Sequence, residues 1–390
     1  MGDVGQPGLK RFVGLWGSLH NLSMKLILHI TTRMEWETAV SPAAYSPPSL
    51  AAEGFIHCST PEQVLGVANN LFHGQSGLVL LCLDEDRLDA SVVYEDCYES
   101  GTKFPHIYGP INPEALLGVA DFPPGADGRF ALPPLVALAA APILEFDPSL
   151  QAMIQPERVL NPIDIAEHCV FCFFQDVITA LREDGRLRPI HTLYSEIGPN
   201  PVYEMEMDGR RLAVMHPGLG SAMAAGFMEE IIALGCRKFI ACGGAGVLDG
   251  TLALGHVVVP DTAVRDEGAS YHYLPGTAVA VASATAVAAI QNTLTRHHVP
   301  FVVGKTWTTD GVYRETKRIV ARRQRAGCLT VEMETAAFCA VAQLRGVLFG
   351  QILYGGDNLT GDEWDNRSWQ SRADIRQNLF QLAAEACLSL

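Results

Sequence analysis

The most constraining stretch of this chain is residues 329–342, LTVEMETAAFCAVA, because its character changes abruptly at two carboxylates. The β-branched pair Thr330 and Val331 favours a strand, and the alanine-rich run that follows favours a helix. Glu332 and Glu334 lie between these two runs. In an α/β domain, ligands collect where the carboxyl end of a strand meets a helix N-terminus, and the helix dipole tolerates negative charge there. We therefore expect a ligand site at this junction.

The surrounding region, residues 164–390, alternates strand and helix signals. This alternation predicts an α/β domain with a central mixed, mostly parallel sheet flanked by helices. Two strands joined at Asp208-Gly209 are expected to form a hairpin. The segment RKFIACGGAGVLD is expected to be a strand that runs into a glycine-rich loop.

The rest of the chain divides by composition, and 390 residues suggest two domains. Residues 24–133 combine short strand and helix signals and predict a smaller α+β domain. Residues 134–163 are rich in Pro and Ala without sustained period, which indicates a linker. Residues 1–23 are expected to be a disordered extension or a mis-called start, with Met24 near the true beginning.

The formal net charge of −15 argues against broad contact with nucleic acid or an anionic membrane, because neutralising phosphates takes a basic face. No stretch approaches the roughly 20 apolar residues of a membrane span. The ten cysteines form no disulfide framework, so we expect a cytoplasmic protein. Cys169 and Cys172 form a CxxC inside an apolar run, where buried strand residues are favoured over a metal or redox role.

Four polar residues of the smaller domain are candidates for a site: His29, His57, Glu95 and His106. The three histidines end apolar strands or lie in a Pro-rich loop, so they could converge on one cleft, or each could be a structural imidazole. No HxH or HxxxH pair supports a metal site, and none is predicted. The motifs GFIHCS and FPHIYGP resemble a small domain family of unknown function. The strand-borne histidine in LHIT is also similar to that of ADP-ribosyltransferase-like folds, which implies a nucleotide-like ligand with Glu95 as the polarising carboxylate.

Five motifs of the larger domain occur in a characteristic order: HPGLGSAMAA, FIACGGAGVLDGTLALGHVVVP, EGASYHY, TTDGVY, and VEMETAA with YGGD. In this order they resemble the nucleoside phosphorylase superfamily, which includes purine and uridine phosphorylases and methylthioadenosine nucleosidases. The likeness covers about residues 165–390. It implies cleavage of the N-glycosidic bond of a small-molecule nucleoside, and by analogy a homo-oligomer.

The resemblance also implies roles for single residues. Glu334 would bind the ribose hydroxyls, Met333 would pack on the ribose face, and Glu332 would lie near the sugar. Asp357 would donate a proton toward purine N7, which favours a purine-type base. Further substrate-binding positions implied by the motifs are Gly220, Ser221, Gly243, Gly244, Tyr313 and His272.

The attacking nucleophile is where this sequence departs from the phosphorylases. Ala241 and Met223 stand where the family places phosphate ligands, although Arg265 or Arg314 could replace them. Nucleosidases of the superfamily instead activate water with a carboxylate after the first strand, where this chain has Asp176. Three functions stay open: a phosphorylase with inorganic phosphate as co-substrate and no other cofactor, a phosphate-independent nucleosidase, and a non-catalytic nucleoside sensor.

Overall fold

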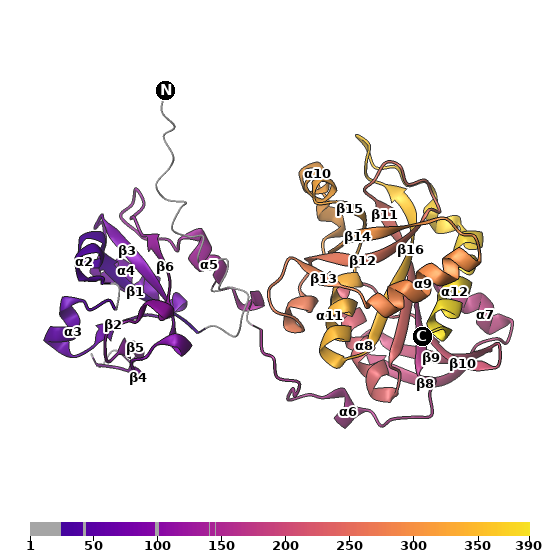
Figure 1. Cartoon of the computed structure of the whole chain (residues 1–390), viewed down its shortest axis with the longest axis horizontal. Helices are drawn as coiled ribbons and strands as arrows, with labels where there is room; N and C mark the ends of the chain where they lie inside the picture. The colour runs from indigo at the N-terminus through magenta and orange to yellow at the C-terminus, as the bar shows by residue number, and fades with distance from the viewer. Residues whose placement is uncertain (1–24, 42–43, 98–100, 140, 145) are drawn as a thin grey trace. The chain divides into compact units, whose positions relative to one another are not determined.

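The computed structural model describes residues 25–390 except 42–43, 98–100, 140 and 145. The chain divides into two compact units, the first ending at Asp147 and the second beginning at Pro148 (Figure 1). This division falls inside the stretch that the sequence predicts as a linker. The predicted extension, residues 1–23, and Met24 lie outside the described residues.

Unit 1 contains two three-stranded antiparallel sheets. The first has the order β1-β3-β6, and the second has the order β2-β5-β4. The strands are β1 (Leu26–Thr32), β2 (Ile56–His57), β3 (Leu78–Asp84), β4 (Val92–Glu95), β5 (Phe104–Ile107) and β6 (Leu116–Asp121). The helices are α2 (Arg33–Ala39), α3 (Pro48–Glu53), α4 (Pro61–Leu71) and α5 (Pro134–Ala139). The predicted α+β architecture is confirmed.

One prediction for unit 1 is wrong. His106 was expected to lie in a Pro-rich loop, but its segment FPHI forms the middle strand β5. Phe104 precedes a proline, which restricts it to extended backbone, and β5 pairs with a strand on each side. Backbone pairing with distant partners therefore overrides the loop signal of the nearby Pro and Gly residues.

Unit 2 is built on one ten-stranded sheet with the order β13-β12-β14-β15-β11-β7-β10-β9-β8, and β16 pairs with β11 and β12. The strands are β7 (His168–Cys172), β8 (Arg188–Ser195), β9 (Gly198–Met207), β10 (Arg210–Met215), β11 (Lys238–Val247), β12 (Val257–Asp266), β13 (Val279–Val281), β14 (Phe301–Thr309), β15 (Cys328–Glu332) and β16 (Leu348–Asn358). The two longest pairings, β11 with β16 and β12 with β14, are parallel. Antiparallel pairs lie mainly at the two ends of the sheet, so it is mixed, as expected.

Helices flank this sheet, as the alternating pattern predicts (Figure 1). They are α6 (Pro156–Val159), α7 (Gln175–Glu183), α8 (Ser221–Leu234), α9 (Ala284–Arg296), α10 (Lys317–Arg325), α11 (Thr335–Arg345) and α12 (Ala373–Leu388). Helix α8 packs with α11, and α9 packs with α12. No helix within the described ranges has both the length and the apolar composition needed to cross a bilayer.

Local sequence signals explain most element ends in unit 2. The β9–β10 hairpin turns at Asp208 and Gly209, which have φ angles of 52° and 74° and so match the Asp-Gly signal. The glycine-rich segment after residue 242 is not a loop, because β11 continues through it to Val247. The YGGD motif lies at the end of β16. These two strands pair in parallel, which orders both glycine-rich segments.

The buried core of unit 2 includes both cysteines of the CxxC motif. Cys169 and Cys172 are fully buried in β7, and all cysteines in the described residues are free thiols. Phe338 of α11 is also fully buried and stacks on Phe171 with a centroid separation of 5.2 Å. Its ring lies 4.9 Å from that of Phe349. Phe338 therefore fixes α11 against β7 and β16.

Truncation of this ring tests the packing that holds α11. We expect Phe338→Ala to lower the free energy of unfolding by about 3–5 kcal/mol, because it removes a buried aromatic side chain and leaves a cavity. Denaturant unfolding of the full chain measures the change. Tyr194→Ala, which removes a ring that is 76% exposed, is the control and should change stability by less than about 0.5 kcal/mol. Equal losses in the two variants would contradict the assignment.

Candidate active site

The junction between β15 and α11 is organised by the carboxylate of Glu332. Its Oε2 accepts hydrogen bonds from the backbone N–H groups of Glu334 and Thr335, each at 2.7 Å. Its Oε1 accepts a hydrogen bond of 2.6 Å from the Thr308 hydroxyl. Glu332 therefore satisfies donors at the N-terminus of α11, where a negative charge is favoured by the helix dipole. Its contacts hold the strand-to-helix turn in place, and its predicted position near the sugar stays a prediction.

Glu334 occupies the N-cap position of α11 and is 5% exposed. Its Oε1 accepts a hydrogen bond of 2.6 Å from the backbone N–H of Gly220. Burial, followed by the charge of Glu332, raises the pKa of Glu334 to about 8. Burial also raises the pKa of Glu332. The junction thus holds two buried carboxyl groups that compete for one negative charge, an arrangement typical of functional sites.

The N-terminus of α8 is tied to this junction. Gly220 is the N-cap residue of α8, with a φ of 88° that favours glycine. The next residue, Ser221, donates its hydroxyl proton to the carbonyl of Met333 at 2.6 Å. Ser221 is 1% exposed, so its hydroxyl is used to join α8 to the junction. The predicted substrate contacts of Gly220 and Met333 lie beside this link, whereas Ser221 faces away from solvent.

Two glycines of β11 allow aromatic rings to approach the strand closely. A Cβ atom on Gly243 would lie 3.3 Å from the ring of Phe173. A Cβ atom on Gly244 would lie 3.1 Å from Trp369 and 3.2 Å from Tyr354. A side chain at either position would displace these rings, so the aromatic surface beside β11 depends on both glycines.

Asp357 lies near the end of β16 and is partly exposed. The indole Nε1 of Trp364 donates a hydrogen bond of 2.7 Å to its Oδ2. A second acid, Glu315, is close enough that burial and then the charge of Asp357 raise its pKa to about 7. Sequence reasoning missed Glu315, although it follows the TTDGVY motif by only two residues. Two neighbouring acids, Asp357 and Glu315, are thus available for proton transfer.

Asp176 lies in the first turn of α7 and pairs with a cation that sequence reasoning missed. Arg376 of α12 donates to its Oδ1 at 2.8 Å. The Arg376 guanidinium also lies 5.1 Å from the ring centroid of Phe174 and 5.8 Å from that of Trp369. These two residues are 200 positions apart in the chain, so no local pattern could reveal the pair. The pair holds Asp176 against α12, and its predicted role in activating water stays a prediction.

Arg265 is unsuited to hold phosphate. It is buried, and its guanidinium donates to the Ser270 hydroxyl at 2.8 Å, to the Pro275 carbonyl at 2.6 Å and to the Leu274 carbonyl at 3.1 Å. Through these contacts the guanidinium group holds the loop that follows β12. The idea that Arg265 replaces the missing phosphate ligands is therefore wrong. Arg314, the other arginine considered for this role, is exposed.

Two of the predicted substrate contacts lie at the surface of the single chain. Tyr313 is 95% exposed, and His272 is also exposed. They belong to the short 3-10 turns η5 (Val312–Arg314) and η4 (Ala269–His272). Within one chain Tyr313 does not cover the site.

A cavity of about 540 Å³ lies beside the β10–α8 loop that carries Gly220. Its wall includes His216, Gly218 and Met223. The Nδ1 atom of His216 accepts a hydrogen bond of 3.1 Å from the Gly218 N–H, and burial lowers the pKa of His216. The predictions did not single out His216, although it begins the HPGLG motif. The cavity is of a size that holds a small molecule.

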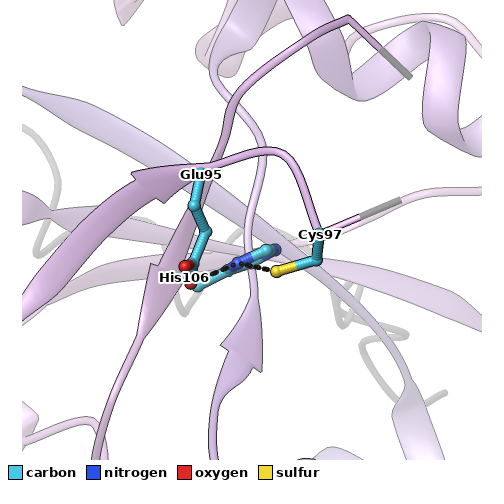
Figure 2. A group of neighbouring side chains, drawn as sticks. All are labelled: Glu95, Cys97 and His106. Carbon is cyan, nitrogen blue, oxygen red and sulfur yellow. Dashed lines mark hydrogen bonds and ion pairs between the residues drawn. The ribbon is translucent and has the colours of Figure 1, made fainter. Parts of the chain in front are cut away.

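Unit 1 contains a second group of predicted site residues. His29, His57 and His106 line one cavity, and Glu95 contacts His106. Figure 2 shows Glu95 and Cys97 directed at the same nitrogen of His106. Within the described residues, these three side chains form the one group whose ligand atoms, all within 4.8 Å of one another, could hold a metal ion. The expectation of no metal stays a prediction.

Fold and junction together define an α/β ligand-binding domain of the nucleoside phosphorylase type. The family model described as the phosphorylase superfamily matches residues 167–389, more than half of the chain. The chain therefore belongs to the phosphorylase superfamily. A second family model, for a protein of unknown function (DUF952), matches residues 30–119.

Individual relatives agree with this assignment. A guanosine phosphorylase of Halorubrum lacusprofundi is 30% identical over 152 residues, which cover 39% of this chain and 63% of the relative. A uridine phosphorylase of Haemophilus influenzae is 25% identical over 47% of this chain and 79% of the relative. The crystal structure of a uridine phosphorylase from Vibrio fischeri, 22% identical, matches with a TM-score of 0.50 over 62% of this chain and all of that one. The structural likeness shows the fold.

The raised pKa of Glu334 gives a test of its environment. Its folded-state pKa of about 8 exceeds its ordinary value, so folded protein keeps a proton that unfolded chains release between pH 4.5 and 8. Wild-type stability therefore falls across this interval. We expect Glu334→Gln to have nearly the wild-type melting temperature at pH 5 and to exceed it progressively toward pH 8, as scanning calorimetry can measure. Glu183→Gln, at an exposed position of α7, should show no such trend; a flat difference for Glu334→Gln would contradict the prediction.

Proposed function

We propose that unit 2 cleaves the N-glycosidic bond of a nucleoside, with a purine-type base favoured. The observation that carries this proposal is the Glu334 carboxyl group, which is buried, lies at a helix N-terminus and uses one oxygen for Gly220. In its ionised form Glu334 has about four acceptor sites, so it can accept from two adjacent ribose hydroxyls; these donors favour loss of the proton that burial otherwise keeps on the carboxyl group. Membership of the phosphorylase superfamily supports this reading.

The reaction breaks the bond between C1′ and the base nitrogen. The bonding electrons pass to the base, and a proton delivered to the base neutralises it as it leaves. Asp357 and Glu315 are the acids we propose for this transfer, and a pKa of about 7 keeps Glu315 partly protonated at neutral pH. An oxygen of phosphate or water then bonds to C1′, and in the hydrolytic case the water gives up one proton, for which Asp176 is the proposed acceptor.

Phosphorolysis is the first candidate, because the relatives described above are named as phosphorylases. Hydrolysis is the second candidate, and a specific observation favours it. Ala241 is fully buried, Met223 packs against Gly218, and Arg265 is held by its own loop. Of the two arginines considered as replacements, phosphate would then have Arg314 alone, whereas phosphate normally binds an Arg together with several further donors.

We further propose a homo-oligomer in the cytoplasm. The exposure of Tyr313 and His272 supports the first part, because a neighbouring copy would cover groups that a single chain leaves in water. The free thiols support the second part, because a reducing compartment keeps cysteines unpaired.

Product analysis tests the reaction. The full chain is incubated with inosine or uridine, with and without inorganic phosphate. We expect release of the base from inosine, with ribose 1-phosphate as the sugar product if phosphorolysis operates and free ribose if hydrolysis operates. Tight nucleoside binding without release of base, with or without phosphate, would contradict the proposed cleavage. The non-catalytic nucleoside sensor would then be the remaining function.

Substitution of Glu334 tests the ribose contact. We expect Glu334→Gln to lower kcat/KM by about 100-fold, because an amide cannot accept two hydroxyl protons as a carboxylate does. The measurement is initial-rate kinetics with the preferred nucleoside. Glu183→Gln is the matched control and should retain wild-type kinetics, while an active Glu334→Gln would refute the assignment.

The same assay can distinguish the roles of Asp357 and Glu315 in protonating the base. We expect Asp357→Asn to lower kcat for inosine by about 100-fold, the usual scale of lost proton transfer. Glu315→Gln should remove the limb of the pH–rate profile near pH 7 if Glu315 supplies the proton. Unchanged kcat and pH profile in both variants would show that neither acid protonates the base.

A further inference from the structure

Unit 1 contains a cavity of about 620 Å³ with histidines from three strands in its wall. His29 comes from β1, His57 from β2 and His106 from β5. These residues are far apart in the sequence, so only strand pairing brings them together. The volume falls within the range of small-molecule sites.

The wall is mainly apolar and lacks cationic side chains among the described residues. Its apolar members are Leu28, Ile30, Val67, Leu71, Phe72 and Phe104. No Lys or Arg of the described chain lines the cavity, and its one acidic group is Glu35. Phosphate groups bind to Arg, Lys or several backbone donors, so this wall does not suit a phosphorylated ligand. It suits an uncharged molecule with broad apolar faces.

His29 offers a hydrogen-bond acceptor. It is 6% exposed, and its Nδ1 lies 2.6 Å from the carbonyl oxygen of His57, so Nδ1 carries the proton. Burial lowers the pKa of His29 to about 4, which keeps the ring neutral at neutral pH and leaves Nε2 as an acceptor. The Tyr45 hydroxyl lies 3.4 Å from Nε2 and 3.2 Å from the Thr31 hydroxyl. Its single proton goes to the nearer Thr31, so Nε2 can accept from a ligand.

The Glu95 carboxylate holds His106 in the same tautomer as His29, with the proton on Nδ1. The His106 Nδ1 lies 3.1 Å from Glu95 Oε1 (Figure 2). The Tyr108 hydroxyl donates to the same oxygen. A carboxylate that accepts Nδ1–H fixes the tautomer and leaves Nε2 as an acceptor. Phe55 lies 4.4 Å from the His106 ring and 4.8 Å from the His57 ring, which restricts the planes of both imidazoles.

We propose that unit 1 binds an uncharged planar nitrogen heterocycle with N–H donors on one edge. His29 and His106 accept these hydrogen bonds, and the apolar wall covers the faces of the ring. Free nucleobases and pyridine carboxamides share this chemistry. The site is separate from the glycosidic site of unit 2, and the inference does not rest on the proposed function.

Calorimetric titration of the full chain with hypoxanthine, uracil and nicotinamide tests the proposal and separates these sources. We expect saturable binding of at least one of them that persists in Asp357→Asn and is weakened about tenfold or more in His29→Gln, since a buried hydrogen-bond acceptor is lost. Nucleoside cleavage by His29→Gln should equal that of the wild type. No binding of any probe, or loss only in Asp357→Asn, would overturn the proposal.

Further variants keep the test decisive if His29→Gln does not fold. Glu95→Ala changes a partly exposed residue and should also weaken binding, because it removes the acceptor that fixes the His106 tautomer. His73→Gln, at an exposed histidine outside the cavity wall, should bind normally. Neither Cys97→Ser nor the addition of a chelator to the wild type should change ligand binding. Loss of binding under both conditions would show that a metal ion holds the ligand, and would overturn the proposal. Binding of AMP that His29→Gln abolishes would overturn the uncharged ligand class.

Discussion

The larger domain depends on one interaction, the capping of α11 by the buried Glu332 carboxylate. Two backbone N–H groups and one hydroxyl satisfy this carboxylate, so the strand-to-helix turn keeps one shape. That turn sets the position of Glu334 at the helix N-cap. An ionised group without such partners would be costly to bury, so the hydrogen bonds are what permit two acids at one junction.

Other segments assemble on this turn. The β10–α8 loop reaches it through Gly220 and Ser221, from more than 100 positions away in the chain. The glycines of β11 bring aromatic rings beside the sheet, and β16 carries Asp357 into the same sheet through its parallel pairing with β11. The Glu334 carboxyl group, the aromatic surface and Asp357 thus lie on elements of one sheet domain, and ligand sites of α/β domains are commonly built at strand ends of this kind.

Unit 1 follows a comparable logic on a smaller scale. A carboxylate, Glu95, fixes an imidazole, His106, across the β4–β5 pairing, and burial keeps a second imidazole, His29, neutral. The sequence identified all three residues as candidates, the histidines from their places at a strand end or in a Pro-rich loop and Glu95 from a resemblance. It could not assign them hydrogen-bonding states, because those depend on the carbonyl of His57 and on Tyr108, which tertiary pairing supplies.

The sequence by itself determined the alternating strands and helices, the hairpin at Asp208-Gly209 and the junction with its two glutamates, because these follow from local propensity and hydrophobic period. Tertiary structure alone decided that Glu332 caps a helix, that Arg376 pairs with Asp176, that Arg265 holds its own loop and that Glu315 lies near Asp357. Each of these depends on groups distant in the chain or on burial. Periodicity records which face of an element is buried, but not which partner it meets there.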